Sequence, residues 1–171
     1  MLKAILREAN RKALSLRRLR NIPRDFPANP FDLASSLGAS IRFLDVKTLE
    51  GMFTRDPAPT IWLPCSQHRP VGRVYFSCAH ELGHFQLGHA VSVDKVGETI
   101  ESNREDERAA DSFASWLLMP RQAVDSSFKR RNATPMSADA LTLLTIAGEL
   151  GVSLDALAKH ICYSLDMANS T

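Results

Sequence analysis

Three residues near the middle of the chain have the types and the spacing of a hydrolytic metal centre. His80, Glu81 and His84 spell H-E-x-x-H within FSCAHELGHFQLGH, residues 76 to 89. On a helix that turns about 100° per residue, the two histidines lie about 40° apart, so both imidazoles can reach one ion. Glu81 borders that face, where its carboxylate can take a proton from a water molecule in the metal cavity. The alternative is that the three side chains merely pack inside a buried helix, which is disfavoured because charged groups are rarely buried without partners.

A tetrahedral catalytic zinc site needs a third protein ligand and one open position. His89 lies close by, but the longer pattern H-E-x-x-H-x-x-G-x-x-H requires glycine at 87 and histidine at 90. This chain has Leu87 and Ala90 at those positions. On a continuing helix the side chain of His89 would also point about 140° away from His84. We therefore interpret His89 as a helix C-terminal residue and not as a ligand.

A second stretch, EDERAADSFASWLLMP (residues 105 to 120), supplies a better third ligand. Glu107 and Asp111 share one helical face with Ala110 and Ala114. We therefore predict that Glu107 completes the metal site and that Asp111 accepts the free ring N–H of a metal-bound histidine. The alternative is a solvated acidic cluster in which no member is special, made of Glu101, Glu105, Asp106 and Glu107.

Two helices have to bring these residues together. The first is predicted from about Pro70 to His89, where the pattern is helical and nearly apolar all round. The second is predicted from about Glu105 to Met119, where a proline ends it. Residues 92 to 104 between them are interpreted as a loop. Gly83 of the first helix would permit a close approach by the two alanines of the second.

Three short stretches upstream predict a small sheet. IRFLDV, GMFTR and TIWL, at residues 41 to 46, 51 to 55 and 60 to 63, are rich in β-formers and separated by turn residues. Prolines flank the third stretch, and proline is tolerated at the margins of edge strands, so TIWL is predicted to be an exposed edge. Ile61 and Trp62 are then the candidates for pairing with an extended substrate.

The predicted fold is α+β, with a small three-stranded antiparallel or mixed sheet packed on a helical core that contains the H-E-x-x-H helix. A short helix over residues 31 to 37 precedes the sheet. Two helices, over residues 138 to 150 and 154 to 165, form a C-terminal helical hairpin, with Gly151 and Ser153 as caps.

Composition is typical of a soluble globular protein. Of the 171 residues, 44% are hydrophobic and 23% are charged, and no apolar run is long enough to cross a bilayer. The three cysteines are widely spaced and odd in number, which suits a reducing cytosol. The N-terminus lacks the apolar segment of a secretory signal. We expect a cytoplasmic protein without a membrane segment.

The N-terminal segment is strongly basic. Its first 24 residues carry eight Lys or Arg against Glu8 alone, a net charge of +7. We predict that residues 1–26 form a basic helix and linker, with an apolar side that packs on one domain of residues 27–171. Contact with nucleic acid or another anionic partner is the alternative. LTIAGELGVSLDALAKH also resembles a helix-turn-helix, but its second helix offers only Lys159 as a fixed cation, so direct nucleic-acid binding is not expected.

The combination of FSCAHELGH and ERAADSFASWLLMP resembles the ImmA/IrrE family of zinc-dependent metallopeptidases, over about residues 27 to 165. The resemblance implies a gluzincin-like, zincin-like domain with one Zn2+ per chain, Mn2+ being the alternative ion. It makes Glu81 the general base and places Asp111 at the Asn/Asp position of the family motif. The ligands that it implies are His80, His84 and Glu107.

The resemblance also implies a substrate. Members of the family cleave helix-turn-helix repressors of phages, mobile elements or stress regulons, and the resemblance therefore predicts a repressor encoded nearby as the partner. The alternatives are a DNA-binding regulator and a partner-sequestering protein with a structural zinc site. The sequence does not choose among the candidate donors to the oxyanion, which are Arg73, Tyr75, His89, His160 and Tyr163.

Overall fold

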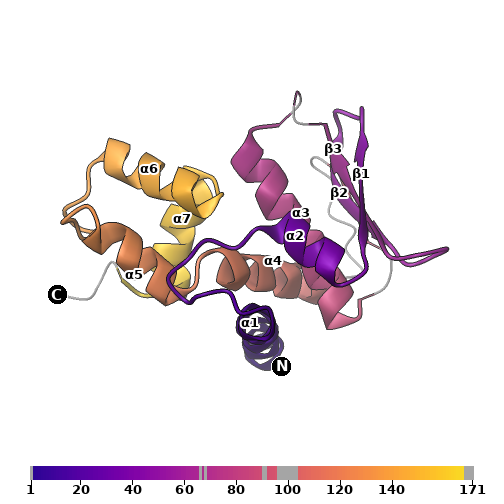
Figure 1. Cartoon of the computed structure of the whole chain (residues 1–171), viewed down its shortest axis with the longest axis horizontal. Helices are drawn as coiled ribbons and strands as arrows, with labels where there is room; N and C mark the ends of the chain where they lie inside the picture. The colour runs from indigo at the N-terminus through magenta and orange to yellow at the C-terminus, as the bar shows by residue number, and fades with distance from the viewer. Residues whose placement is uncertain (1, 66, 68, 90–91, 96–103, 168–171) are drawn as a thin grey trace.

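The computed structural model describes residues 2–65, 67, 69–89, 92–95 and 104–167. It confirms the α+β class: a mixed sheet lies on one side of a helical core, and a C-terminal helical lobe lies on the other (Figure 1). The elements are α1 (Leu2–Leu19), α2 (Pro30–Ser36), β1 (Ser40–Leu44), β2 (Leu49–Thr54), β3 (Thr60–Pro64), α3 (Val71–Leu87), β4 (Ser92–Lys95), α4 (Arg104–Leu118), α5 (Arg121–Lys129), α6 (Ala140–Leu150), α7 (Leu154–Lys159) and a π-helical turn (His160–Ser164).

The described strands form one sheet in the order β1-β3-β2-β4. β1 runs parallel to β3, whereas β2 runs antiparallel to both β3 and β4. Successive residues of a strand point to opposite faces, and the face that carries Phe53, Ile61 and Leu63 is fully buried in the core. The three predicted strands are therefore present, in a mixed sheet that packs against α3.

The prediction that TIWL forms an exposed edge is wrong. Ile61 of β3 is in register with Ile41 of β1 on one side and with Phe53 of β2 on the other. The Ile61 side chain is fully buried, and Trp62 Nε1 donates a hydrogen bond to Thr54 Oγ1 (3.1 Å). The flanking prolines are compatible with an inner strand because they lie at its ends, where a missing backbone N–H removes few hydrogen bonds from the sheet. Ile61 and Trp62 therefore cannot pair with an added substrate strand.

The expectation of a loop over residues 92 to 104 also needs correction. Ser92–Lys95 forms β4, which pairs with β2, and α4 begins at Arg104. Four residues that include an aspartate and a lysine do not carry a strand pattern, so only the pairing with β2 identifies this strand. Residues 96–103 lie outside the described residues. The edges of the described sheet are therefore β1 and β4.

α3 and α4 cross in close contact at Gly83. A Cβ atom built on Gly83 would lie 3.2 Å from both the Cα and the carbonyl oxygen of Ala110. Ala110 and Ala114 are fully buried. Ala110 thus meets Gly83 as the sequence predicted, and the crossing fixes how α4 presents its side chains to α3.

α1 packs against α4 and crosses it, with its apolar side in the contact as predicted (Figure 1). Ala9 and Ala13 are fully buried in this contact face. The basic residues Lys3, Arg7, Arg11 and Arg18 are exposed on the opposite side. Arg17 differs from these residues, because it is buried and donates hydrogen bonds to the carbonyls of Leu117 (2.7 Å) and Pro23 (2.8 Å).

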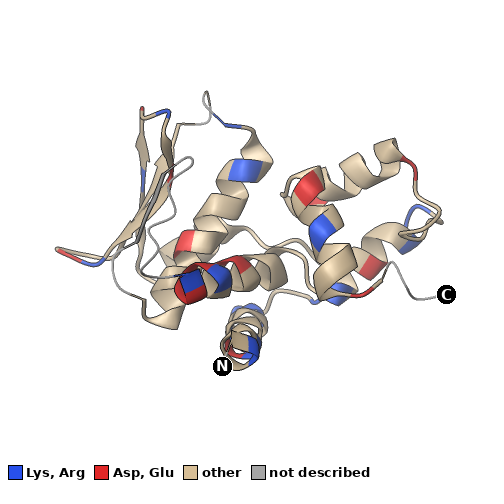
Figure 2. Cartoon of the chain, turned by 180° about the vertical axis from the view of Figure 1, so that it is seen from behind, with Lys and Arg blue, Asp and Glu red and all other residues tan. Residues whose placement is uncertain are grey.

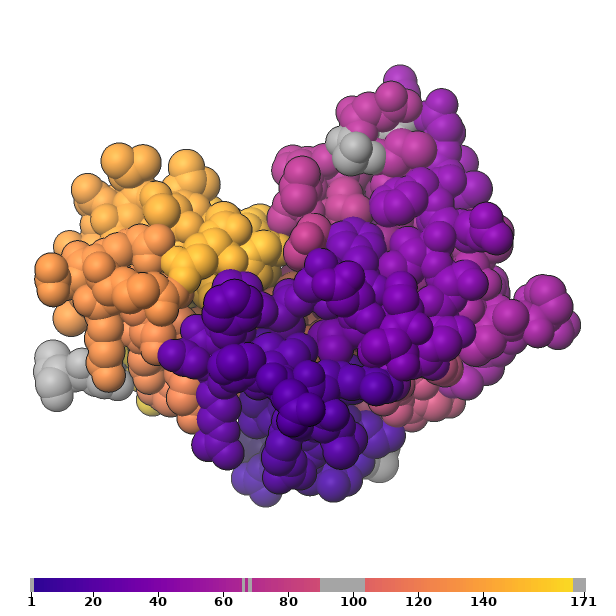
Figure 3. All heavy atoms as spheres, in the orientation of Figure 1, coloured from indigo at the N-terminus to yellow at the C-terminus, as the bar shows by residue number. Residues whose placement is uncertain are grey.

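The C-terminal lobe contains the predicted hairpin and one further helix, α5, for which no element was predicted. Gly151 ends α6 in the left-handed conformation (φ 70°), and Ser153 Oγ caps α7 by accepting from Ala156 N (3.1 Å). Both caps match the prediction. In the space-filling view a hollow separates this lobe from the sheet side of the molecule (Figure 3).

Among the described helices, none is by itself long and apolar enough to cross a membrane. The pair Ala140–Leu150 and Leu154–Ser164 reaches that length only when its two arms, which are bent by 98°, are counted together.

Candidate metal centre

The first half of the site lies on α3. His80, Glu81 and His84 are all buried on this helix, and its C-terminal half is enclosed by the sheet and by α4. The helix ends at Leu87, because Gly88 adopts the left-handed conformation (φ 79°) that other residues rarely tolerate. Both histidines therefore stand within the last three turns of a rigid element.

The second half of the site lies on α4, whose N-terminal half is densely charged (Figure 2). The Glu107 carboxylate lies 3.2 Å from His80 Nε2 and 3.5 Å from His84 Nε2. The two Nε2 atoms are themselves 3.0 Å apart. The structure thus brings the three predicted ligands together, one atom from each within 4.8 Å of the others.

This donor set fits a tetrahedral ion. Ligand bonds of about 2.0 to 2.2 Å place tetrahedral ligand atoms about 3.3 to 3.6 Å apart. The two Nε2 atoms are 3.0 Å apart. His80 Nε2 lies 3.2 Å from one oxygen of the Glu107 carboxylate and His84 Nε2 lies 3.5 Å from the other, separations near that range. Two imidazoles and a carboxylate are also the ligand types of catalytic zinc sites.

Glu107 is held as a carboxylate, the form in which it could bind a cation. Burial by itself raises the pKa of Glu107, but the hydrogen bonds and charges of His80 and His84 outweigh it, and the pKa lies well below its usual range. Deprotonated ligands are what metal binding requires.

Asp111 lies where the sequence predicts it. Its Oδ1 is 2.9 Å from His80 Nδ1, although the side chain is 61% exposed. A neutral His80 that donates its Nδ1–H to Asp111 keeps the lone pair of Nε2 directed at Glu107 and His84. The Asp111 carboxylate therefore lies within hydrogen-bond reach of the His80 ring nitrogen that does not face Glu107 and His84.

Glu81 is fully buried between α3 and β2. Its Oε1 lies against the backbone of Gly51, so closely that a Cβ atom at position 51 would overlap it. Gly51 is not among the site residues predicted from the sequence, although a glycine inside a strand often marks the close approach of another group. Gly51 is therefore a residue of this site that the residue pattern could have revealed.

His89 lies just beyond the end of α3, and not within its C-terminal turn as predicted. Because α3 ends at Leu87, the chain turns at Gly88 and brings the His89 ring back to His84, with the two Nδ1 atoms 3.0 Å apart. His89 Nε2 faces Asp106 Oδ1 at 3.4 Å. Burial lowers the pKa of His89, while the Asp106 charge opposes this effect. Neither ring nitrogen faces the space among the three ligand atoms, so His89 contacts a ligand without being one.

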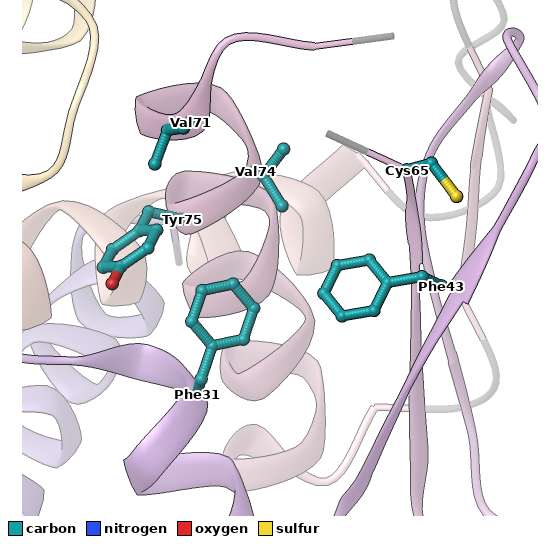
Figure 4. A pocket seen from close by; sticks show the side chains of 6 residues that line it. All are labelled: Phe31, Phe43, Cys65, Val71, Val74 and Tyr75. Atoms are coloured by element: carbon teal, nitrogen blue, oxygen red, sulfur yellow. The ribbon is translucent and has the colours of Figure 1, made fainter. Parts of the chain in front are cut away.

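Most of the candidate oxyanion donors are engaged elsewhere. Arg73 is bound to Glu50 (2.7 Å). His160 Nε2 bonds the carbonyl of Met119 (2.9 Å). Tyr75 lines an apolar pocket on the side of α3 that faces α2 and β1, as Figure 4 shows. Of the five, Tyr163 and Arg73 are exposed, and Arg73 is paired with Glu50.

One comparison with known proteins identifies the chain. The family model described as the IrrE N-terminal-like domain, a peptidase family, matches residues 34–161. A comparison with curated proteins finds no match. The matched range runs from α2 to the π-helical turn, so it includes both helices of the site and every candidate ligand. The chain therefore belongs to the ImmA/IrrE family of metallopeptidases.

Proposed function

We propose that the protein is a zinc-dependent endopeptidase that cleaves a helix-turn-helix repressor and thereby derepresses the genes that this repressor silences. The proposal rests on one observation: one ligand atom from each of His80, His84 and Glu107 lies within 4.8 Å of the others, and Glu81 is buried on the helix that carries the two histidines. The convergence favours hydrolysis over a purely structural metal site, because a structural site commonly closes its coordination with four protein ligands.

The side chains divide the chemistry among them. A divalent ion held by the three ligands would polarise the scissile carbonyl and lower the pKa of a water molecule towards about 7. Glu81 accepts the proton of the attacking water and then delivers it to the leaving amide nitrogen. Asp111 holds His80 in the tautomer that binds the ion. Gly51 leaves space for the Glu81 carboxylate.

The alternative function, a DNA-binding regulator, is disfavoured by an ion pair in the C-terminal hairpin. Lys159, the fixed cation of its second helix, pairs with Asp155 on the same helix (2.7 Å). A cation with an intramolecular partner contributes less to phosphate binding, which dominates affinity for DNA.

Co-expression with the repressor encoded by a neighbouring gene tests the proposal, with the Glu81→Gln variant as the matched control. Glutamine keeps the shape of the side chain but cannot accept the proton. We expect intact repressor to disappear with the parent protein and to persist with the variant, whose rate should fall by about 100-fold or more. Both proteins should contain equal zinc. Equal loss of repressor with the two proteins would refute the role of Glu81.

A further inference from the structure

We propose that His89 is a positioning residue for His84: it accepts the Nδ1–H of His84 through its own Nδ1 and directs its Nε2–H to Asp106. The inference rests on the proposed metal site and assigns a second hydrogen-bond chain to it. His80 is oriented directly by a carboxylate, whereas His84 would be oriented through a second imidazole.

The proton positions follow from the distances. His84 can offer the lone pair of Nε2 to an ion only when its proton is on Nδ1. That nitrogen lies 3.0 Å from His89 Nδ1, which must then be the acceptor. A neutral His89 carries its remaining proton on Nε2, the atom that faces the Asp106 carboxylate at 3.4 Å. One assignment of protons therefore satisfies both contacts, from His84 to His89 and from His89 to Asp106.

The backbone holds His89 in this position from both sides. The left-handed Gly88 turns the chain, and His89 N donates to the carbonyl of His84 (3.1 Å). The carbonyl of His89 accepts from Arg55 Nη2 (3.1 Å). Arg55 is in turn fixed over the Phe53 ring, with its guanidinium carbon 5.2 Å from the centroid. The His89 side chain is only 11% exposed, so its ring is confined where it meets His84.

The contact between His84 and His89 combines ring packing with a hydrogen bond, and substitutions can separate the two. The rings of His84 and His89 meet edge to face, with centroids 5.0 Å apart and planes at 72°. A purely packing role would be met by any side chain of similar volume. A positioning role requires an acceptor at the place of Nδ1. Asparagine offers such an acceptor, because its Oδ1 is attached to Cγ as Nδ1 is in histidine, whereas leucine offers only volume.

The test measures zinc affinity of the full chain by competition with a chromophoric chelator, for the parent, His89→Asn and His89→Leu. Loss of a hydrogen-bond partner behind a ligand typically costs about 10- to 100-fold in metal affinity. We expect that loss in the leucine variant and a change of less than about 3-fold in the asparagine variant. An unchanged leucine variant, or equal losses in both, would overturn the proposal.

A second pair of variants decides the matter should His89→Leu fail to fold. Asp106→Ala removes the carboxylate that faces His89, and Glu105→Ala removes another acidic residue from the same first turn of α4. We expect only Asp106→Ala to weaken zinc binding, and equal effects would contradict the proposal. A parent that binds no zinc would refute the metal site and this inference together. A parent that binds zinc but cleaves no repressor would refute only the proposed substrate.

Discussion

At the scale of single residues, Glu81, the proposed base, is packed directly against the backbone of β2 at Gly51. Gly51 has no φ in the left-handed region, so its role is to leave room and not to relieve backbone strain. Built on the backbone, a Cβ atom at position 51 would lie 3.0 Å from Glu81 Cγ and 3.1 Å from Cδ. The carboxylate would then have to move.

We therefore expect Gly51→Ala to lower the peptidase rate by about 10-fold or more, because a base displaced by a fraction of an ångström loses its alignment. Zinc content should not change, since the three atoms nearest to an added Cβ at position 51 all belong to Glu81, which is not a candidate ligand. The measurement is the cleavage rate of Gly51→Ala in the parent and in Glu81→Gln. If Gly51→Ala acts through Glu81, it should lower the cleavage rate little further when Glu81→Gln is already present. Additive losses would show that it acts elsewhere.

At the scale of elements, the site depends on how closely α3 and α4 approach. Alanine normally stabilises a helix by about 1 kcal/mol relative to glycine. At Gly83 the nearest atoms to an added Cβ belong to the backbone of Ala110, which cannot rotate away. Any separation of the helices moves Glu107 away from the two histidines.

We expect Gly83→Ala to give no gain in stability and to weaken zinc binding. The matched control is Gly148→Ala on α6, where an added Cβ meets nothing within 4 Å. This control should gain up to about 1 kcal/mol and bind zinc normally. Urea unfolding and chelator competition measure the two effects. Equal stabilisation at positions 83 and 148 would show that the crossing is less tight than the structure indicates.

The elements also show how far the sequence could predict the fold. α3 and α4 follow from apolar periodicity and helix-ending residues, so the relative positions of His80, His84 and Glu107 could be anticipated. The position of β3 inside the sheet could not, because strand order depends on which distant segments pair. β4 and α5 are short, and β4 exists through its pairing with β2. The contact of His89 depends on a helix that ends at Leu87, and helix ends are hard to predict to the residue.

At the scale of the whole molecule, α1 is tied to the domain through one buried charge. Arg17 donates to the carbonyls of Leu117, Pro23 and Phe26, which lie at the end of α4 and in the segment after α1. Burial lowers the pKa of Arg17 to about 10, so the guanidinium stays charged at neutral pH. This arrangement leads us to expect that α1 unfolds together with the rest of the chain.

We expect Arg17→Met to reduce the free energy of unfolding by about 3 kcal/mol, because buried carbonyls lose charged donors. The matched control, Arg18→Met, alters an exposed cation on the same turn and should change stability by less than about 0.5 kcal/mol. Urea unfolding followed by circular dichroism should show a single transition for both. A small separate transition for Arg17→Met would instead support residues 1–26 as an independent unit.

His160 ties the C-terminal lobe to the end of α4. Burial lowers the pKa of His160 to about 4, with a contribution from the Arg121 charge, although the hydrogen bond to the Met119 carbonyl opposes this shift. The ring also meets Trp116 edge to face, with centroids 5.6 Å apart. His160 is therefore neutral in the folded protein at pH values where the unfolded chain already binds a proton.

This difference makes stability depend on pH in a defined window. The unfolded chain takes up a proton below a pH of about 6.5 and the folded chain only near its pKa of about 4. The contribution is thus fully present above pH 6.5 and is lost as the pH falls towards 4, by about 3 kcal/mol in all. His160→Gln keeps an N–H donor for Met119 but does not titrate. Its free energy of unfolding, measured in urea from pH 7 to 4.5, should fall less steeply than that of the parent. Parallel curves for the two proteins would mean that His160 is protonated in the fold and that its contact with α4 is weaker than the structure shows.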